Sequence, residues 1–387
     1  MTTAKGYTEM KDSGIQWIGQ IPTHWLLKKA KYCVSITNGS DPKSEGSVPV
    51  YGSGSESFKT CGEYKEGPAV LIGRKGATLH IPHYIEGRYW NVDTAFDVKP
   101  QEDFSLRYYY YLACVFDYNY YISQTTLPGM TQTNYNNMKL PCPSLDEQTA
   151  IASYLDAQCA KIDEIIAQAK ASIEDYKQWK ASIIYEAVTK GLDPNVEMKD
   201  SGIEWIGRMP AHWTAPALKH LCTMQAGKNL ISEQISTSGR YPVYGGNGQR
   251  GYYSDYNVNG NFLLVGRQGA LCGNVHCVSG KFWATEHAVV TTPSKITNIS
   301  YLYYLLIAMD LNQYASNSAA QPGLSVGNIL TVKTLLPPID EQVRISEFLD
   351  NCCPRIDEVI TEKQSLIDDL ESYKKSLIYE VVTGKRR

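Results

Sequence analysis

The sequence of 387 residues contains two copies of one pattern, each about half the chain long. Residues 10–25 recur at residues 198–213 with identity at 12 of 16 positions. Because order and spacing are both kept, the two halves are expected to fold alike as an internal repeat. Further blocks return 188 to 194 positions later, namely P-V-Y-G at Pro49 and Pro242, G-R-x-G-A at Gly73 and Gly266, and [LI]-D-E-Q at Leu145 and Ile339.

Each half is expected to hold a mixed α/β globular domain followed by one long helix. The first part of each half is rich in Gly, Asn, Ser and Tyr. Short apolar runs typical of buried strands occur there at residues 69–72 and 262–265. Residues 106–115 and 301–309 have a more helical pattern. The sequence therefore predicts an α+β fold with two mixed α/β domains.

The last part of each half predicts a long helix. Its apolar residues follow one another at steps of mostly three and four, which is a near-heptad spacing. Pro143 and Pro338 stand where such helices can begin, and Gly191 and Gly384 where they can stop. One such helix cannot bury its apolar stripe, but two in the same chain can bury each other's.

We therefore expect an antiparallel coiled coil and a pseudo-twofold relation between the halves. A coiled coil that only dimerises would show the same stripe. The predicted domains are residues 1–143, the first globular domain; 144–197, the first helix; 198–336, the second globular domain; and 337–387, the second helix.

The net charge of −3 conceals an uneven distribution. Residues 1–143 and 198–335 carry 14 and 10 Lys and Arg against 13 and 6 Asp and Glu. Residues 144–197 and 337–387 carry 5 and 8 against 10 and 11. A positive balance in the globular domains is compatible with two modest phosphate-facing patches joined by acidic spacers. Ordinary solvated surfaces would give the same counts.

Several classes of protein do not fit the sequence. No apolar run approaches the roughly 20 residues that span a bilayer. The first residues lack the apolar core of a signal peptide, and the ten cysteines lack paired C-x-x-C spacing. We therefore expect a soluble, cytoplasmic protein that does not bind a membrane.

No catalytic or metal-binding motif is evident. The chain has no P-loop, no H-E-x-x-H, no G-x-S-x-G and no [ND]-P-P-[YF] tetrapeptide. Cysteines and histidines at residues 220–222 and 272–277 could be imagined as zinc ligands. Only His276 among them has a possible counterpart, His83, in the other half, so no metal site is expected.

The order of domain, helix, domain and helix resembles the specificity subunit of type I restriction–modification systems. A G-x-x-W-x-G-x-x-P-x-x-W segment before each domain, the G-R-x-G-A segments and the [LI]-D-E-Q blocks carry this resemblance over essentially the whole chain. It implies a non-catalytic subunit with two target-recognition domains, each reading one half of a bipartite site in double-stranded DNA.

The resemblance also implies partners for the chain. The helices would set the spacer between the half-sites and dock two modification (methyltransferase) subunits, and restriction (endonuclease and translocase) subunits would join that core. S-adenosylmethionine, Mg and ATP would be bound by those partners, so this chain itself is expected to carry no cofactor.

Three polar loops in each half are the candidates for DNA contact. Arg and Lys can bond guanine O6 and N7, Gln can pair with adenine, and flanking glycines let the backbone approach a phosphate. We expect the shared Arg74 and Arg267 to position the DNA and the differing Lys75 and Gln268 to specify bases. The full candidate set is Ser53, Ser55, Arg74, Lys75, Thr78, Thr131, Gln132 and Asn134 in the first half, and Asn247, Gln249, Arg250, Arg267, Gln268, Ser325 and Asn328 in the second.

Other interpretations of these residues remain open. Each loop could be a solvated turn, and the arginine of G-R-x-G could pair with a local carboxylate. A coiled-coil scaffold whose globular domains bind proteins is the main alternative function. A duplicated enzyme is disfavoured because the polar loops differ between the halves. The paired tryptophans of residues 10–25 and 198–213 are expected to pack structurally.

Overall fold

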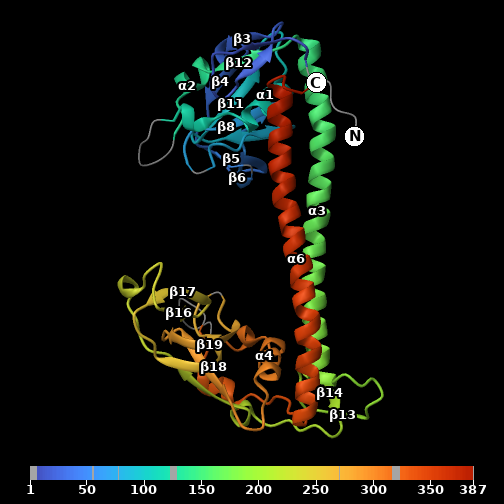
Figure 1. Ribbon diagram of the computed structural model, residues 1–387. Helices are drawn as coiled ribbons and strands as arrows, with labels where there is room; N and C mark the ends of the chain where they lie inside the picture. Colours follow the sequence, from blue (N-terminus) through green and yellow to red (C-terminus); the bar gives the residue numbers. More distant parts are fainter. Residues whose placement is uncertain are drawn as a thin grey trace. The chain divides into compact units, whose positions relative to one another are not determined.

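The computed structural model describes residues 7–54, 56–76, 78–122, 129–269, 271–315 and 323–386. The chain forms two compact units: unit 1 comprises Met1–Lys170 and Gln364–Arg387, and unit 2 comprises Ala171–Lys363. Each unit therefore holds one globular domain, the first part of one long helix and the last part of the other (Figure 1).

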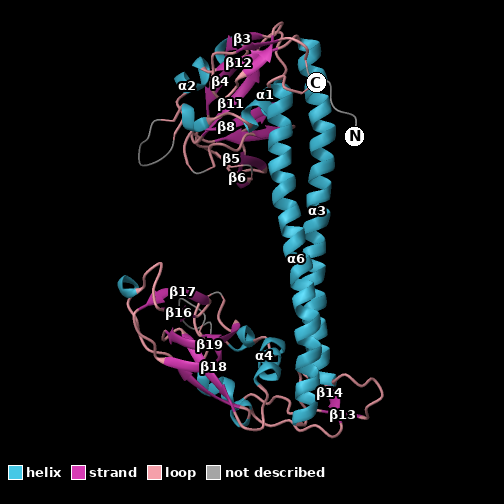
Figure 2. Ribbon diagram, in the orientation of Figure 1, coloured by secondary structure: helices cyan, strands magenta, loops and turns pink. Residues whose placement is uncertain are grey.

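The globular part of unit 1 is built on two four-stranded sheets, and Figure 2 separates their strands from the helices. The first sheet, antiparallel throughout, has the order β4 (Val34–Asn38), β11 (Ala95–Pro100), β8 (Ala69–Gly73) and β9 (His83–Ile85). The second has the order β6 (Ser57–Cys61), β5 (Val48–Tyr51), β10 (Arg88–Asn91) and β7 (Lys65–Glu66). Two short strand pairs and two helices complete the globular part of unit 1. The strand pairs are β1 (Met10–Asp12) with β2 (Gln20–Pro22) and β3 (Leu26–Lys29) with β12 (Lys139–Cys142). The helices are α1 (Leu106–Cys114) and α2 (Gln132–Asn137).

The globular part of unit 2 merges the equivalent strands into one six-stranded sheet. Its order is β15 (Cys222–Ala226), β20 (Ala288–Pro293), β18 (Val258–Gly266), β19 (Val275–Ala284), β16 (Tyr241–Gly245) and β17 (Gly248–Tyr253). The pair β13 (Met198–Asp200) with β14 (Arg208–Pro210) and helices α4 (Ile299–Ala308) and α5 (Val326–Thr331) repeat their unit 1 counterparts.

The strands and helices expected from the sequence are confirmed. The apolar runs at residues 69–72 and 262–265 lie in β8 and β18, and every residue of β8 is buried. The helical runs are α1 and α4, whose N-caps Ser105 and Asn298 each accept a hydrogen bond from the backbone N–H three residues later.

The two long helices are α3 (Leu145–Lys190) and α6 (Ile339–Val382). Gly191 and Gly384 follow them with φ of +76° and +72°, the left-handed conformation that commonly ends a helix. Helix α6 continues through Pro354 although proline lacks the N–H that the interior of a helix uses.

Within each unit the two helices run antiparallel. In unit 1, Asp163 pairs with Lys374 at 2.6 Å and Lys170 approaches Glu371 at 3.9 Å, so residue numbers rise on α3 as they fall on α6. In unit 2, Lys180 pairs with Asp357 at 2.6 Å, and the Lys363 ammonium lies 5.6 Å from the ring centroid of Tyr176.

The helices bury their apolar stripes in the cores of the units. In unit 2, one cluster joins side chains of both helices to the strands and to α4. Its buried members on α3 and α6 are Ile184, Ala187, Val188, Ile345, Leu349 and Cys353. In unit 1, the buried positions of the stripe include Leu155, Cys159, Ile162, Ile166, Leu377, Ile378 and Val381.

The glutamine of each [LI]-D-E-Q block attaches a long helix to its globular domain. Gln342 is fully buried, accepts a hydrogen bond from Asn298 N at 2.8 Å, and donates to the carbonyls of Ile296 and Pro337. Gln148 makes the matching bond to Ser105 N, also at 2.8 Å. The repeated block is therefore a structural joint between a helix start and the N-cap of a neighbouring helix.

The tryptophan segments, residues 10–25 and 198–213, are held by both long helices. The Tyr379 hydroxyl near the end of α6 donates to Trp17 O at 3.0 Å, and Tyr185 near the end of α3 donates to Trp205 O at 2.9 Å. Trp25 and Trp213 are fully buried, which agrees with a packing role for these segments.

Replacing Gln342 with alanine should destabilise unit 2. The substitution leaves the Asn298 N–H and two carbonyls without their partner, and each such buried group costs about 1–3 kcal/mol. We expect the midpoint of urea unfolding, followed by circular dichroism, to fall clearly. Gln364→Ala, at an exposed position of α6, is the control and should leave the midpoint unchanged; equal effects of the two substitutions would contradict the proposed joint.

Candidate nucleic-acid interface

In unit 1 the three candidate loops converge on the turn that follows β8. Lys75 forms a β-bridge with Gly129, and Met130 N donates to Arg74 O at 2.9 Å, which brings in the loop before α2. The Ser53 and Thr78 hydroxyls lie 3.0 Å apart, which joins the loop after β5. Sequence positions more than fifty residues apart thus share one surface.

Unit 2 repeats the same convergence with different side chains. Gln268 forms a β-bridge with Gly323, and Leu324 N donates to Arg267 O at 2.9 Å. A Cβ built on Gly246, in the loop after β16, would lie 3.7 Å from Arg267 N. The backbone of the two surfaces is therefore built alike.

The two glycines of each G-R-x-G turn have separate structural roles. A Cβ on the first glycine would lie 2.2 Å from Leu79 Cα at Gly73 and 2.1 Å from Gly246 O at Gly266. The second glycine has φ of +105° at Gly76 and +93° at Gly269, where side chains are strained. Close approach to the protein's own backbone therefore already requires the first glycine, whatever is bound outside.

The two shared arginines stand in different surroundings. The Arg74 Nη1 donates to Asp93 O at 3.2 Å, lies 4.0 Å from Asp93 Oδ2, and its guanidinium stands over the Phe96 ring. Arg267 is exposed, and no ion pair or side-chain hydrogen bond holds it among the residues the structure describes. Pairing of the arginine with a local carboxylate therefore occurs in unit 1 and is absent from the described part of unit 2.

Lys75, Gln268 and Thr78 are exposed on these surfaces, as base-contacting groups would need to be. Arg250 and Asn328 are exposed as well, and the structure gives neither side chain a hydrogen bond within the described residues. Apart from the Thr78 hydroxyl, which lies 3.0 Å from that of Ser53, these positions keep their hydrogen-bonding groups available for a ligand. Ser55 lies outside the described residues.

Other candidate side chains are already engaged within the protein. Gln132 donates to Ile36 O and Asn134 to Tyr121 O, so both amides support local structure. Thr131 and Ser325 are exposed N-caps of α2 and α5.

In unit 2, two polar side chains at the turn between β16 and β17 also make contacts within the protein. The side-chain Oδ1 of Asn247 accepts from Asn274 Nδ2 at 2.9 Å. Gln249 makes a long contact of 3.5 Å with Gly251 O. Asn274 was not among the predicted positions.

Sequence reasoning missed a fourth part of each surface, the residues just before β11 and β20. Arg74 N donates to Thr94 O at 2.8 Å, and Arg267 N donates to His287 O at 2.9 Å. Asp93 and Glu286 precede them, 193 positions apart, which is the spacing of the two G-R-x-G turns. That shared offset is the signal from which these positions could have been found.

The histidines on the neighbouring strands add no positive charge. His83 pairs with Leu71 across β8 and β9, and His276 pairs with Leu264 across β18 and β19. Burial lowers the pKa of both imidazoles. Both rings are therefore neutral at physiological pH.

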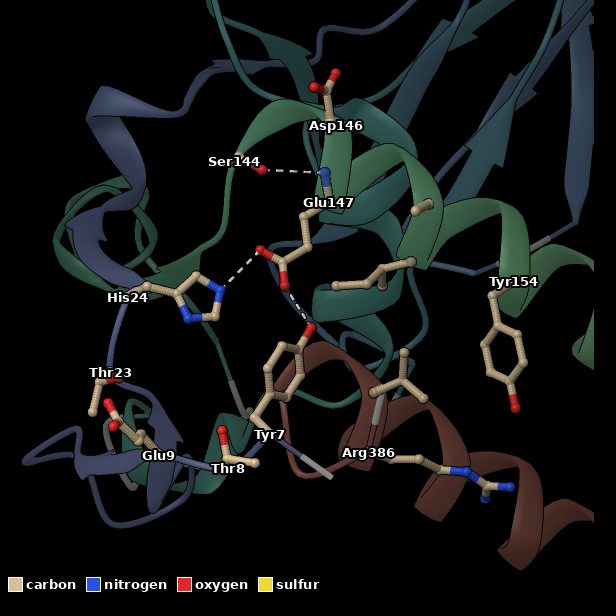
Figure 3. Close-up of a pocket in the computed structure, with 13 residues that line it drawn as sticks. Tyr7, Thr8, Glu9, Thr23, His24, Ser144, Asp146, Glu147, Tyr154 and Arg386 are labelled. Atoms are coloured by element: carbon tan, nitrogen blue, oxygen red, sulfur yellow. Dashed lines mark hydrogen bonds and ion pairs between the residues drawn. The ribbon is translucent and has the colours of Figure 1, made fainter. Parts of the chain in front are cut away.

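A pocket of about 990 Å³ in unit 1 lies where α3 begins. The Tyr7 hydroxyl donates to the Glu147 carboxylate, and His24 Nε2 lies 3.4 Å from Glu147 Oε2 (Figure 3). The Ser144 hydroxyl accepts from Glu147 N at 3.3 Å and thus caps α3. No hydrogen bond joins Ser144 to His24 within the described residues.

The described residues contain neither a cluster of metal ligands nor a membrane-spanning helix. No three His, Cys, Asp or Glu side chains gather there as metal ligands would. Within the same residues, no helix has both the length and the apolarity needed to cross a membrane.

Alanine at Gly266 should disrupt the turn far more than alanine at Gly269. The first substitution puts a methyl group 2.1 Å from Gly246 O, whereas the second meets open space and carries only backbone strain of about 1–3 kcal/mol. Thermal unfolding should show a much lower midpoint for Gly266→Ala. Similar midpoints for the two variants would contradict this prediction, because they would mean that the backbone at Gly246 moves away from the added methyl group at little cost.

Comparison with known proteins identifies the family. Residues 30–175 and 210–367 match the type I restriction modification DNA specificity domain. The EcoprrI specificity subunit of Escherichia coli is 47% identical over 137 residues, which are 34% of each chain. The MjaVIII specificity subunit of Methanocaldococcus jannaschii is 25% identical over 290 residues, 68% of this chain and 65% of that protein. The matches thus span less than two thirds of either relative.

A solved structure supports the fold. It is described as showing complex assembly and conformational transition of the type I R-M system, and it matches 94% of this chain and 98% of its own with a TM-score of 0.71 at 14% identity. The family match covers both halves and more than half of the residues. The chain therefore belongs to the family of type I restriction–modification specificity subunits.

Proposed function

We propose that each globular domain reads one half of a bipartite site in double-stranded DNA. The observation that carries this proposal is the paired surface around the G-R-x-G turns. In each unit, main-chain hydrogen bonds bring together polar loops from separate parts of the domain. Base edges are read by side chains on such a scaffold, while backbone and phosphate contacts set the register.

The side chains on the two surfaces differ where the backbones agree. Lys75 stands where unit 2 has Gln268, and Thr94 where it has His287. Lysine favours guanine O6 and N7, whereas glutamine pairs with adenine. Two unlike half-sites are therefore the proposed target. A duplicated enzyme would instead keep the same reactive groups, so we propose a non-catalytic subunit.

The long helices are proposed to set the spacer and to dock partners. Each is unbroken across the boundary between the units, at 46 and 44 residues. Trp179 and Tyr373, 194 positions apart, are exposed by 54% and 49%. Exposed aromatic residues are typical anchors of protein interfaces. One anchor on each unit suits two copies of the same partner, which we propose to be modification subunits.

The catalytic parts of the complex are proposed to lie in those partners. Methyltransferase subunits would bind S-adenosylmethionine, and restriction subunits would bind Mg and ATP. The site of action would be the cytoplasm, where cellular DNA is modified. The competing scaffold function predicts binding that is insensitive to salt and to Arg74→Ala combined with Arg267→Ala, because protein partners release no DNA counterions.

A methylation map tests the function directly. Plasmid DNA from cells expressing this chain with its neighbouring methyltransferase subunit would be sequenced with long reads. We expect a two-part motif with a fixed gap of unspecified bases. An unmodified plasmid, with the complex shown to be assembled and the methyl donor present, would count against DNA reading and favour the scaffold.

Insertion of one helical turn tests the spacer. Four residues added after Gln168 and after Gln364 lengthen both helices by about 6 Å at 1.5 Å per residue. The gap in the motif should grow by one or two base pairs while both half-sites stay unchanged. Gln168→Ala with Gln364→Ala controls for local effects. A motif of unaltered spacing would exclude the helices as the ruler.

A further inference from the structure

Equivalent acidic residues beside the two surfaces have different partners. Asp93 in unit 1 lies 4.0 Å from the Arg74 guanidinium. Glu286, at the same place in unit 2, has its Oε1 3.3 Å from His287 Nε2. Arg267 takes part in no ion pair within the described residues. The carboxylate thus accompanies arginine in one domain and histidine in the other.

His287 stands at the centre of the unit 2 surface. Its carbonyl accepts from Arg267 N at 2.9 Å. A Cβ on Gly246 would lie 3.1 Å from the same carbonyl and 3.6 Å from Gln268 O. Three loops therefore meet at this residue. Its side chain is 40% exposed, so it is open to a ligand that covers the surface.

The contact between Glu286 and His287 affects the position of the His287 ring more than it affects the stability of the fold. Both side chains are exposed by more than a third, at 40% and 38%, and exposed ion pairs contribute little to folding. A carboxylate beside one ring nitrogen favours one orientation of the ring and the proton on that nitrogen. The other nitrogen, Nδ1, has no hydrogen bond within the described residues and stays available to a base edge. Glu286 Oε2 is buried without a hydrogen-bond partner there, so the carboxylate is not committed to any other residue.

We propose that His287 is a specificity-determining residue of the second domain and that Glu286 positions it. Because Glu286 is directed to His287, Arg267 stays available to DNA. In the first domain, Asp93 holds Arg74, which leaves Lys75 as the exposed cation of the turn. The inference rests on the proposed function, since it assigns the groups that read each half-site.

The test compares reciprocal substitutions in the assembled complex with the methyltransferase subunit. His287→Thr installs the side chain of the first domain, and Thr94→His does the reverse. Long-read methylation maps should show altered preference in one half-site for the first variant and in the other half-site for the second. Loss of one base contact should lower discrimination at that base pair roughly 5- to 150-fold. Glu286→Gln should weaken preference at the same position as His287→Thr.

Salt dependence supplies an independent measurement. An arginine that neutralises a phosphate contributes about one unit to the slope of log affinity against log salt. We expect Arg267→Ala to lower the slope of the complex by about one and Arg74→Ala to lower it much less. If circular dichroism shows that the His287→Thr variant does not fold, His287→Asn takes its place.

The outcomes separate this inference from the function on which it rests. An unchanged motif in folded His287→Thr or His287→Asn complexes would overturn the role of His287. Equal salt slopes for the two arginine variants would overturn the difference between the domains. A wild-type complex that yields no bipartite motif would instead remove the proposed function.

Discussion

The structure depends on the mutual burial of two apolar helix stripes. Neither α3 nor α6 can hide its stripe alone, because an isolated amphipathic helix gains most of its stability from packing. Since the helices run antiparallel within each unit, the start of one is buried with the end of the other. Each compact unit therefore contains the first part of one long helix and the last part of the other. Unit 2 is continuous in sequence, whereas unit 1 is completed by Gln364–Arg387 from the far end of the chain.

Polar residues decide where the helices meet the globular domains. Gln148 and Gln342 join the helix starts to α1 and α4, and Tyr379 and Tyr185 join the helix ends to the tryptophan segments. Buried polar groups must be paired, so these contacts fix one register where an apolar stripe alone would tolerate several. The sequence blocks that repeat most closely are thus structural joints.

In the candidate interfaces, by contrast, the structure depends on the main chain and not on particular side chains. Their backbone is fixed by main-chain hydrogen bonds and bridges that do not depend on side-chain identity. Side chains on that platform can change without loss of the fold, as the pairs Lys75 and Gln268 or Thr94 and His287 illustrate. One architecture can therefore carry two different recognition surfaces in the same chain.

The sequence by itself determined the repeat, the long helices to within a few residues of their ends, and the buried strands β8 and β18, because periodicity and turn residues are local signals. The predicted domain boundaries and DNA contacts stay predictions. Only the tertiary structure decided that Gln132 and Asn134 support the backbone, that Asp93 faces Arg74 while Glu286 faces His287, and that the compact units divide within the helices. Those outcomes depend on contacts between loops and strands that are remote in sequence, and local sequence patterns do not encode such long-range contacts.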